Sequence, residues 1–150
     1  MGDPFLTLSP SESAANEAKT TSKKPTHTHS GVIISRVLIV DDERVIADSL
    51  AQILRARGHA VRVAYDGAEA VAAAKEDCPE IVLTDVIMPR MNGVQAAIAI
   101  RAVCPDTRII LFSGQAATSD LLVEARASGH NFEIWGKPLH PRDLLRKLRG

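Results

Sequence analysis

Two hydrophobic periodicities alternate along the chain from about residue 33 onward. Short apolar runs of strand length recur five times, as IISRVLIV, HAVRVAY, EIVLTD, TRIILFS and NFEIWG. The segments between these runs carry apolar residues at the spacing of one helix face. The first of these stripes consists of Val45, Ile46, Ser49, Leu50, Ile53 and Leu54. Alternation of this kind is typical of βα units, so the pattern predicts five of them.

The expected helices have recognisable ends. Gly58 ends the first helix, and the later four are predicted over residues 67–77, 93–103, 118–128 and 141–149. Consecutive βα units form a parallel sheet through right-handed crossovers, with helices on both faces. Ligands of such sheets bind at the carboxyl ends of the strands, beside the point where the strand order reverses. The residues that follow each strand are therefore the first candidates for a functional site.

The N-terminal residues 1–32 show neither periodicity. They are rich in Ser, Thr, Lys, Glu and Pro and contain little apolar material beyond Phe5, Leu6 and Leu8. Because such a segment buries too little apolar surface to offset the entropy of ordering, we predict a disordered tail over residues 1–32. Residues 33–150 are then one folded domain, which suits a chain of 150 residues that is 45% apolar.

Charge and hydropathy exclude several classes of function. Lys plus Arg and Asp plus Glu are balanced at 18 each, so no global charge excess draws the protein to nucleic acid or to an anionic membrane. The basic stretch RDLLRKLRG is expected to be a solvated helix face. No apolar run approaches the roughly 20 residues of a membrane helix, and MGDPFLTLSP lacks the features of a signal peptide. We therefore expect a cytoplasmic protein without membrane contact.

The two cysteines, Cys78 and Cys104, are expected to be small buried apolar residues. Their spacing fits no CxxC motif, and two cysteines are too few for a disulfide scaffold. They occur in matching contexts, EDCPEIVL and AVCPDTRIIL, in which a proline follows the cysteine and an apolar run then begins. Since proline ends helices and leads into strands, we interpret the repeat as architectural.

Polar side chains follow the predicted strands. Asp41 and Asp42 end the first strand, Asp85 the third, Ser113 the fourth and Lys137 the fifth. A helix cap or a turn explains several of these residues taken singly. Together, however, they place three carboxylates, one hydroxyl and one ammonium at one edge of the sheet.

Three carboxylates gathered at one edge without a cation would be costly or would stay partly protonated, and a divalent metal resolves this conflict. Two of them about 4 Å apart repel by roughly 4 kcal/mol at an effective dielectric constant near 20. Mg²⁺ is held by one or two carboxylates together with waters and phosphate oxygens, and a lysine pairs with a phosphoryl oxygen. The sequence has no Cys-His set, no GxxxxGK[ST] and no GxGxxG after the first strand. The pattern therefore indicates a site for a phosphoaspartate, with a carboxylate as the nucleophile.

Four motifs together resemble the receiver domain of two-component response regulators. They are VDDE at 40–43, LTDVIMPRMNG at 83–93, FSG at 112–114 and GKPL at 136–139, and the resemblance covers residues 33–150. It implies a flavodoxin-like (βα)5 fold, a doubly wound parallel sheet with strand order 2-1-3-4-5. It also implies a phosphorelay function, in which the chain catalyses only its own Mg²⁺-dependent phosphorylation and dephosphorylation.

The resemblance also assigns the metal site. Asp85 would be the phosphoacceptor, taking a phosphoryl group from the phosphohistidine of a sensor histidine kinase or a phosphotransfer protein. Asp42 and Asp85 would bind Mg²⁺ directly, Asp41 would bind it through a water, and the backbone carbonyl of Ile87 would complete the protein ligands. Glu43 matches no ligand position, and we expect it in the first helical turn, where the helix dipole favours an acid.

Other residues are assigned to the phosphoryl group and to the loops. Lys137 would hold one phosphoryl oxygen and Ser113 another. Met88-Pro89 and Gly93 are expected to shape the turn after the acceptor, with glycine permitting a tight bend. Pro138 matches the position of a cis-proline in the family.

One position departs from the family pattern. Receivers carry Tyr or Phe three residues before the lysine, where this chain has Ile134. Phe132 and Trp135 lie nearby but out of register, and we expect them to pack in the core. Phosphorylation should survive this change, whereas we expect any signal to pass through the loop and helix after Ser113 without a rotating aromatic ring.

Partners and alternatives complete the expectations. The resemblance implies that an unknown downstream protein binds the domain. Members of the family also commonly form homodimers through the fourth and fifth helices. No output domain follows in this chain, so it would be a single-domain regulator or an excised receiver.

A phosphatase of the haloacid-dehalogenase type would need DxD on the first strand, where this chain has VDDER. A receiver degenerated into a binding module would not need all the acids and the lysine.

Overall fold

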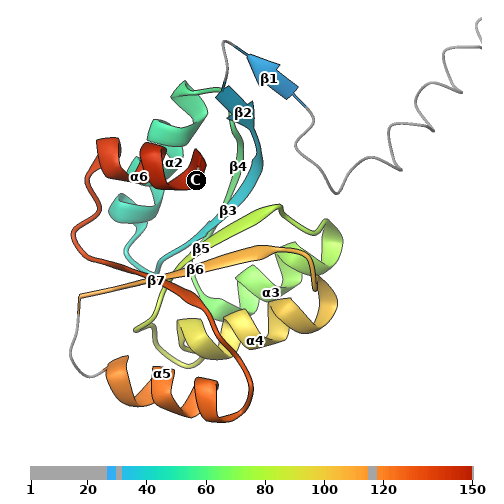
Figure 1. Cartoon of the computed structure of the whole chain (residues 1–150), viewed down its shortest axis with the longest axis vertical. Coiled ribbons are helices and arrows are strands. Elements are labelled where there is room, and N and C mark those ends of the chain that lie inside the picture. Colours follow the sequence, from blue (N-terminus) through green and yellow to red (C-terminus); the bar gives the residue numbers. More distant parts are fainter. Residues whose placement is uncertain (1–26, 30–31, 115–117, 150) are drawn as a thin grey trace, which may run out of the picture.

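A five-stranded parallel sheet forms the centre of the computed structural model, which describes residues 27–29, 32–114 and 118–149 (Figure 1). Its strands are β3 (Arg36–Val40), β4 (Ala60–Ala64), β5 (Ile81–Asp85), β6 (Arg108–Ser113) and β7 (Glu133–Gly136). The spatial order is β4-β3-β5-β6-β7. Numbered by their place in the chain, these strands have the order 2-1-3-4-5, which confirms the expected flavodoxin-like fold.

Helices cover both faces of this sheet. They are α2 (Arg44–Ala56), α3 (Gly67–Glu76), α4 (Gly93–Val103), α5 (Thr118–Ala127) and α6 (Pro141–Arg149). α2 and α6 lie on one face, and α3, α4 and α5 on the other (Figure 1). The predicted helices are confirmed to within about a residue at each end. None of the helices in the described part of the chain combines the length and apolarity needed to cross a bilayer.

The core has two layers because successive side chains of a strand point to opposite faces. Along β3, Val37 and Ile39 pack with the helices α2 and α6. Leu38 and Val40 pack on the other face, with α3 and α4. Every residue of β5 is buried, as expected for the central strand of a parallel sheet that is covered on both faces.

The buried face of α2 is rotated from the predicted stripe. Its buried residues are Ala47, Leu50, Ala51 and Leu54, which follow the i, i+3, i+4, i+7 spacing of a helix face. Val45 is 79% exposed and Ser49 is also exposed. The apolar Val45 is therefore at the surface, one residue after the start of α2.

The N-terminal side of the domain differs from the expectation of disorder. β1 (His27–His29) pairs antiparallel with β2 (Val32–Ile34), so residues 27–29 and Val32 of the predicted tail lie in strands. Residues 1–26 and 30–31 of the predicted tail lie outside the described residues. The first apolar run also divides at Ser35, a buried residue whose backbone N–H donates to Nδ1 of His59 at 3.1 Å.

The two cysteines form a disulfide, so the prediction of two separate apolar residues is wrong. The Cα atoms of Cys78 and Cys104 lie 5.7 Å apart. β5 and β6 are neighbouring parallel strands that pair Ile81 with Arg108. Because the repeated Cys-Pro context precedes each of these strands, it brings both cysteines to the same amino edge of the sheet.

Candidate functional site

The register of the central strands β3 and β5 brings Asp41 and Asp85 together. β3 and β5 pair Val40 with Thr84, so the next residues, Asp41 and Asp85, leave adjacent strands at the same edge. The backbone N–H of Asp41 still donates to Ala64 O at 3.2 Å. This bond continues the sheet and fixes the chain where the acids begin.

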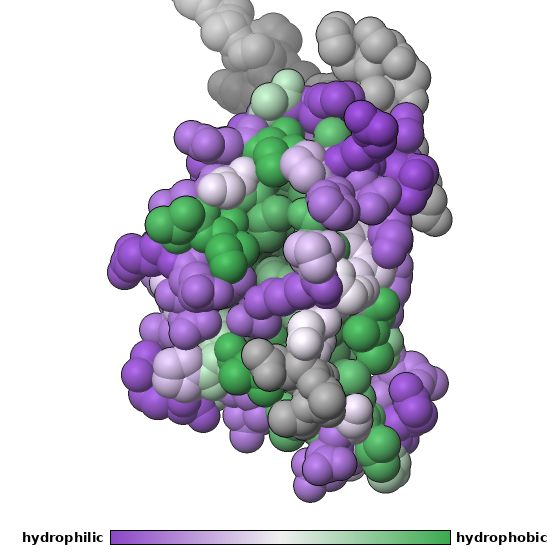
Figure 2. Space-filling view, turned by 90° about the vertical axis from the view of Figure 1, so that its left-hand side faces the viewer, coloured by the Kyte–Doolittle hydropathy of each residue, from purple (hydrophilic) through white to green (hydrophobic). Residues whose placement is uncertain are grey.

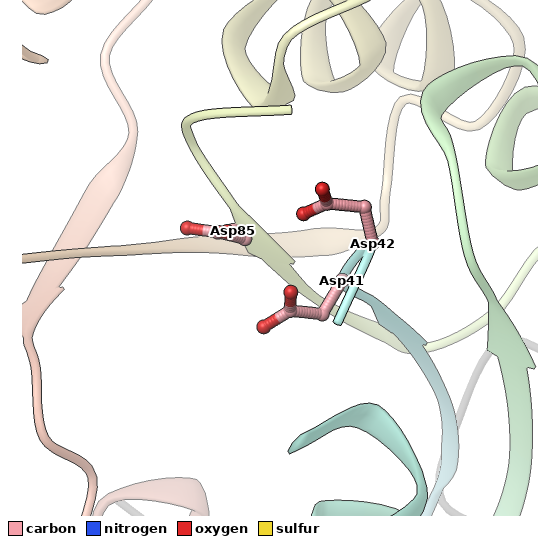
Figure 3. Close-up of side chains that lie close together, drawn as sticks. All are labelled: Asp41, Asp42 and Asp85. Atoms are coloured by element: carbon pink, nitrogen blue, oxygen red, sulfur yellow. The ribbon is translucent and has the colours of Figure 1, made fainter. Parts of the chain in front are cut away.

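Three carboxylates converge at this edge. Asp41, Asp42 and Asp85 each offer an oxygen, and the three oxygens lie within 4.8 Å of one another. Figure 3 shows the three side chains projecting to the same side of the strand ends. Asp41 is fully buried and Asp85 is 6% exposed, whereas Asp42 is exposed. The cluster is therefore open to solvent on the side of Asp42.

Asp41 is the least satisfied of these acids. Its Oδ1 accepts from the backbone N–H of Glu43 at 2.9 Å, but its Oδ2 is buried without a hydrogen-bond partner in the described structure. Burial raises the pKa of Asp41 from 3.8 to about 6, and the charge of Asp85 adds to the rise, against the opposing effect of the Glu43 N–H. The backbone N–H of Glu43 thus holds the carboxylate of Asp41 in the site. Glu43 is the N-cap of α2, and the prediction that it lies in the first turn is wrong.

Lys137 supplies the positive charge of the site. Its Nζ lies 3.2 Å from Oδ1 of Asp85. Burial raises the pKa of Asp85, and the ammonium of Lys137 opposes that rise. The backbone N–H of Lys137 donates to Ser113 O at 3.1 Å, and the Lys137–Pro138 peptide is cis, as expected. β6 and β7 therefore hold the lysine at the carboxyl edge, beside the acids.

The loop after Asp85 is shaped differently from the prediction. Arg90, with a φ of 67°, adopts the left-handed conformation at the bend. Gly93 is instead the first residue of α4, and its N–H donates to Val86 O at 2.7 Å. A Cβ at Gly93 would overlap the carbonyl oxygen of Asp85. Glycine is needed here for close backbone approach, and the tight bend is made by Arg90.

The remaining predicted residues lie at the same edge of the sheet. Ser113 ends β6, where it is half-buried and in register with Gly136 of β7. Ile87 follows Asp85 by two residues, and its side chain is 45% exposed. The strand order therefore places the chain positions of all the predicted site residues at one edge.

The position of the usual aromatic ring is partly open. Ile134 in β7 is 40% exposed. Trp135 is buried between the sheet and α6, as the sequence predicted. Phe132 is only partly buried, and it packs against the other core layer beneath the guanidinium of Arg101.

The site fits a hard divalent cation. Its donors are carboxylate oxygens, and one of them, Oδ2 of Asp41, is buried without a partner in the described structure. Oxygen-only donor sets of this kind suit Mg²⁺. A bound cation would offset the burial and the charge repulsion that now favour the protonated form of Asp41.

An Asp41→Asn substitution is expected to stabilise the metal-free protein in a pH-dependent way. The folded-state pKa of about 6 exceeds the ordinary 3.8, so the folded state binds the proton more tightly and stability falls as pH rises through this window. The variant should gain roughly 3 kcal/mol at neutral pH and almost nothing below pH ~3. Urea unfolding in a chelator would measure this, and a gain that is equal at both pH values would contradict it.

The fold and the site together define the class of this protein. The chain is a doubly wound parallel α/β protein with carboxylates and a lysine at the carboxyl edge of its central strands. The family model of the response regulator receiver domain matches residues 37–149. The chain belongs to this family, whose members act in two-component signal transduction and are not enzymes in the usual sense.

Individual relatives agree with this assignment. The chain is 32% identical over 113 residues to the probable transcriptional regulatory protein TcrX of Mycobacterium tuberculosis, covering 75% of this chain and 47% of that protein. It is also 32% identical to PrrA of Mycobacterium bovis, covering 79% of this chain and 50% of that protein. The chain thus spans about half the length of the curated relatives it matches.

Solved structures of similar proteins have the same fold. A CheY-like receiver domain protein from Methanospirillum hungatei has a TM-score of 0.70 at 31% identity, covering 77% of this chain and 90% of that one. Chemotaxis protein CheY4 of Vibrio cholerae has a TM-score of 0.68 at 30% identity, covering 77% and 96%.

Proposed function

We propose that this receiver domain is the phosphoacceptor of a two-component phosphorelay and that Asp85 accepts the phosphoryl group. The observation that carries the proposal is the surroundings of Asp85 at the end of the central strand. The carboxyl group lies 3.2 Å from the ammonium of Lys137 and shares a cluster with Asp41 and Asp42. A carboxylate with a cationic partner and a metal-ligand set is equipped to accept a phosphoryl group.

The chemistry needs few protein groups. An oxygen of Asp85 attacks the phosphorus of a phosphohistidine, the P–N bond breaks, and the imidazole leaves with its electron pair. Lys137 exchanges part of its contact with Asp85 for a phosphoryl oxygen, and the Ser113 hydroxyl donates to another. A bound Mg²⁺ would neutralise charge on the carboxylates and on the phosphoryl oxygens.

Four residues would hold the metal. Asp42 and Asp85 would bind it directly, Asp41 would bind it through a water, and the backbone carbonyl of Ile87 would be the remaining protein ligand. The burial of the acids supports this division. Asp42 is exposed at the mouth of the cluster, whereas Asp41 lies fully buried behind it.

The phosphodonor is a sensor histidine kinase or a phosphotransfer protein, and it docks beside Lys137. An apolar groove there is lined by Ile46, Leu50, Phe112, Gly114, Pro138 and Leu139, together with the lysine itself. Figure 2 shows the side of the molecule that carries α2 and α6, where apolar residues are exposed among hydrophilic ones. A phosphohistidine must reach Asp85 from this edge, so its carrier covers this groove. Ile46 and Leu50 both belong to the apolar stripe that the sequence predicted for the first helix.

Phosphorylation changes contacts with a downstream protein. Val123 of α5 is 60% exposed and Ile134 of β7 is 40% exposed, so each of these two elements offers an exposed apolar side chain to such a partner. A homodimer through α5 and α6, which lie on opposite faces of the sheet, would use the surface around the edge strand β7. The cytoplasm is the compartment in which these partners would meet the domain, and no contact of this chain with nucleic acid is proposed.

The proposal is tested by incubating the protein with acetyl phosphate and Mg²⁺ and measuring the intact mass. We expect a gain of one phosphoryl group that disappears when a chelator replaces the metal. The same mass with and without Mg²⁺ would contradict the proposal. Incubation with inorganic phosphate in place of acetyl phosphate is the control for adventitious binding.

A further inference from the structure

We propose that Cys78 and Cys104 are a redox-exchangeable modification site, closed by small disulfides and opened by small dithiols, whose state sets the stability of the β5–α4 unit. The bond joins residues 26 apart in the sequence. The loop that it closes contains β5, the turn after Asp85 and all of α4. Both cysteines of the chain are used.

The pair lies where neighbouring parts of the backbone already meet. Thr107, in the turn after α4, donates its buried hydroxyl to Pro79 O at 2.6 Å. The backbone N–H of Arg108 donates to Glu80 O at 3.0 Å. These bonds do not involve sulfur, so they hold the two turns together when the cysteines are reduced. Oxidation therefore adds a covalent link to an existing contact, and both redox states are folded.

The two sulfurs differ in access. Cys78 is exposed, whereas Cys104 is 2% exposed and belongs to the core layer on the α3–α4 face. Thiol–disulfide exchange requires a thiolate to reach one sulfur of the bond. An incoming reagent therefore reacts at Cys78, and Cys104 reacts only with its partner.

The closeness of the two cysteines, whose Cα atoms are 5.7 Å apart, determines the kind of reductant needed. Cys104 is the C-cap residue of α4, where both apolar surroundings and the helix dipole disfavour a thiolate. When a thiol attacks Cys78, the departing Cys104 sulfur must take up a proton. If the reductant is a monothiol, Cys104 can attack the mixed disulfide on Cys78 and restore the protein disulfide. A dithiol instead uses its second thiol to form a cyclic disulfide, which releases Cys78 in its reduced form.

The exchange balances without any further reactant. In oxidation, the Cys78 thiolate attacks glutathione disulfide and releases one glutathione. The Cys104 sulfur then attacks Cys78, forms the protein disulfide and releases the second glutathione. The protein loses two electrons and two protons, which leave as two molecules of glutathione. Dithiothreitol reverses the reaction and is oxidised to its cyclic disulfide.

The compartment and the position of the disulfide both favour a regulatory role for the exchange. In reducing compartments such as the cytoplasm proposed above, disulfides are transient and often regulatory. The pair is at the amino edge of the sheet, whereas Asp85 is at the carboxyl edge. α4 connects the two edges, since Gly93 begins it against Asp85 and Cys104 caps its other end. The inference does not depend on the proposed phosphoacceptor function.

The first test compares the two redox states of the unmodified protein. After dithiothreitol treatment and its removal, an alkylating reagent should label both cysteines in the denatured protein. After glutathione disulfide treatment it should label neither. The oxidised form should unfold about 10 °C higher, and the amides of α4 should exchange hydrogen more slowly. Two labelled cysteines after oxidation, or equal unfolding temperatures, would overturn the proposal.

The second test uses two matched variants under native conditions. Both variants are treated with glutathione disulfide. The Cys104→Ala variant should gain one glutathione at the exposed Cys78, which intact mass measures. The Cys78→Ala variant should gain none, because Cys104 is buried. Circular dichroism checks that both variants fold, and Cys104→Ser replaces the alanine variant if that one does not. Equal modification of the two folded variants would contradict the assignment of Cys78 as the entry point.

Discussion

An Asp85→Asn variant is expected to take up no phosphoryl group from acetyl phosphate in the presence of Mg²⁺. The amide has nearly the shape of the carboxyl group but is not a nucleophile at phosphorus. The substitution also removes one of three acids whose oxygens lie within 4.8 Å of one another. Intact mass measured over a time course would show this, with the gain falling from one group to below detection.

A matched control separates the acceptor from acids in general. Asp106 is an exposed acid in the turn between α4 and β6, at the opposite edge of the sheet. Asp106→Asn should be phosphorylated at the rate of the unmodified protein. The Asp85→Asn variant should also remain folded without metal, because burial raises the pKa of this carboxyl group and disfavours its charge. A folded Asp85→Asn variant that still gained the group would place the acceptor elsewhere.

A Gly93→Ala substitution is expected to cause a large loss of stability. The new Cβ would overlap the Asp85 carbonyl oxygen and also crowd Val86 Cα. These are backbone atoms of the central strand and its exit, so no side-chain rotation relieves the clash. We expect a loss of about 3 kcal/mol despite the better helix propensity of alanine, together with slower phosphorylation, because the strand end that carries Asp85 must shift.

Gly136→Ala is the control for this prediction. A Cβ at Gly136 would meet no atom within 4 Å, so its effect on stability should stay within about 0.5 kcal/mol. Urea unfolding of the two variants and the unmodified protein gives the comparison. If Gly93→Ala proved as stable as Gly136→Ala, the close approach of α4 to the Asp85 backbone would be refuted.

The sequence by itself determined the elements and the chemistry at their ends. Strands and helices were predictable because their hydrophobic periods are local, and five helices were found close to their observed bounds. The acids, the hydroxyl and the lysine each follow a strand directly, so a parallel sheet had to gather them at one edge. The strand order came from the family resemblance, since periodicity contains no information about which strands are neighbours.

The tertiary structure decided which residues meet across the sheet and how deeply each lies. Asp41 and Asp42 are neighbours in sequence, yet only Asp41 is buried with an oxygen that lacks a partner in the described structure. Val45 matched the helical stripe but faces solvent. Gly93 resembled a turn residue, whereas its role is to let α4 approach the backbone of Asp85.

The cysteines show the physical reason for this division most clearly. In the sequence they are 26 residues apart, within a repeat that indicates only where two helices end and two strands begin. The pairing of β5 with β6 brings both Cys-Pro turns to the same edge, with Cα atoms 5.7 Å apart. Local pattern fixes what each segment becomes, but contacts between distant segments depend on strand order and register, which exist only in the assembled sheet.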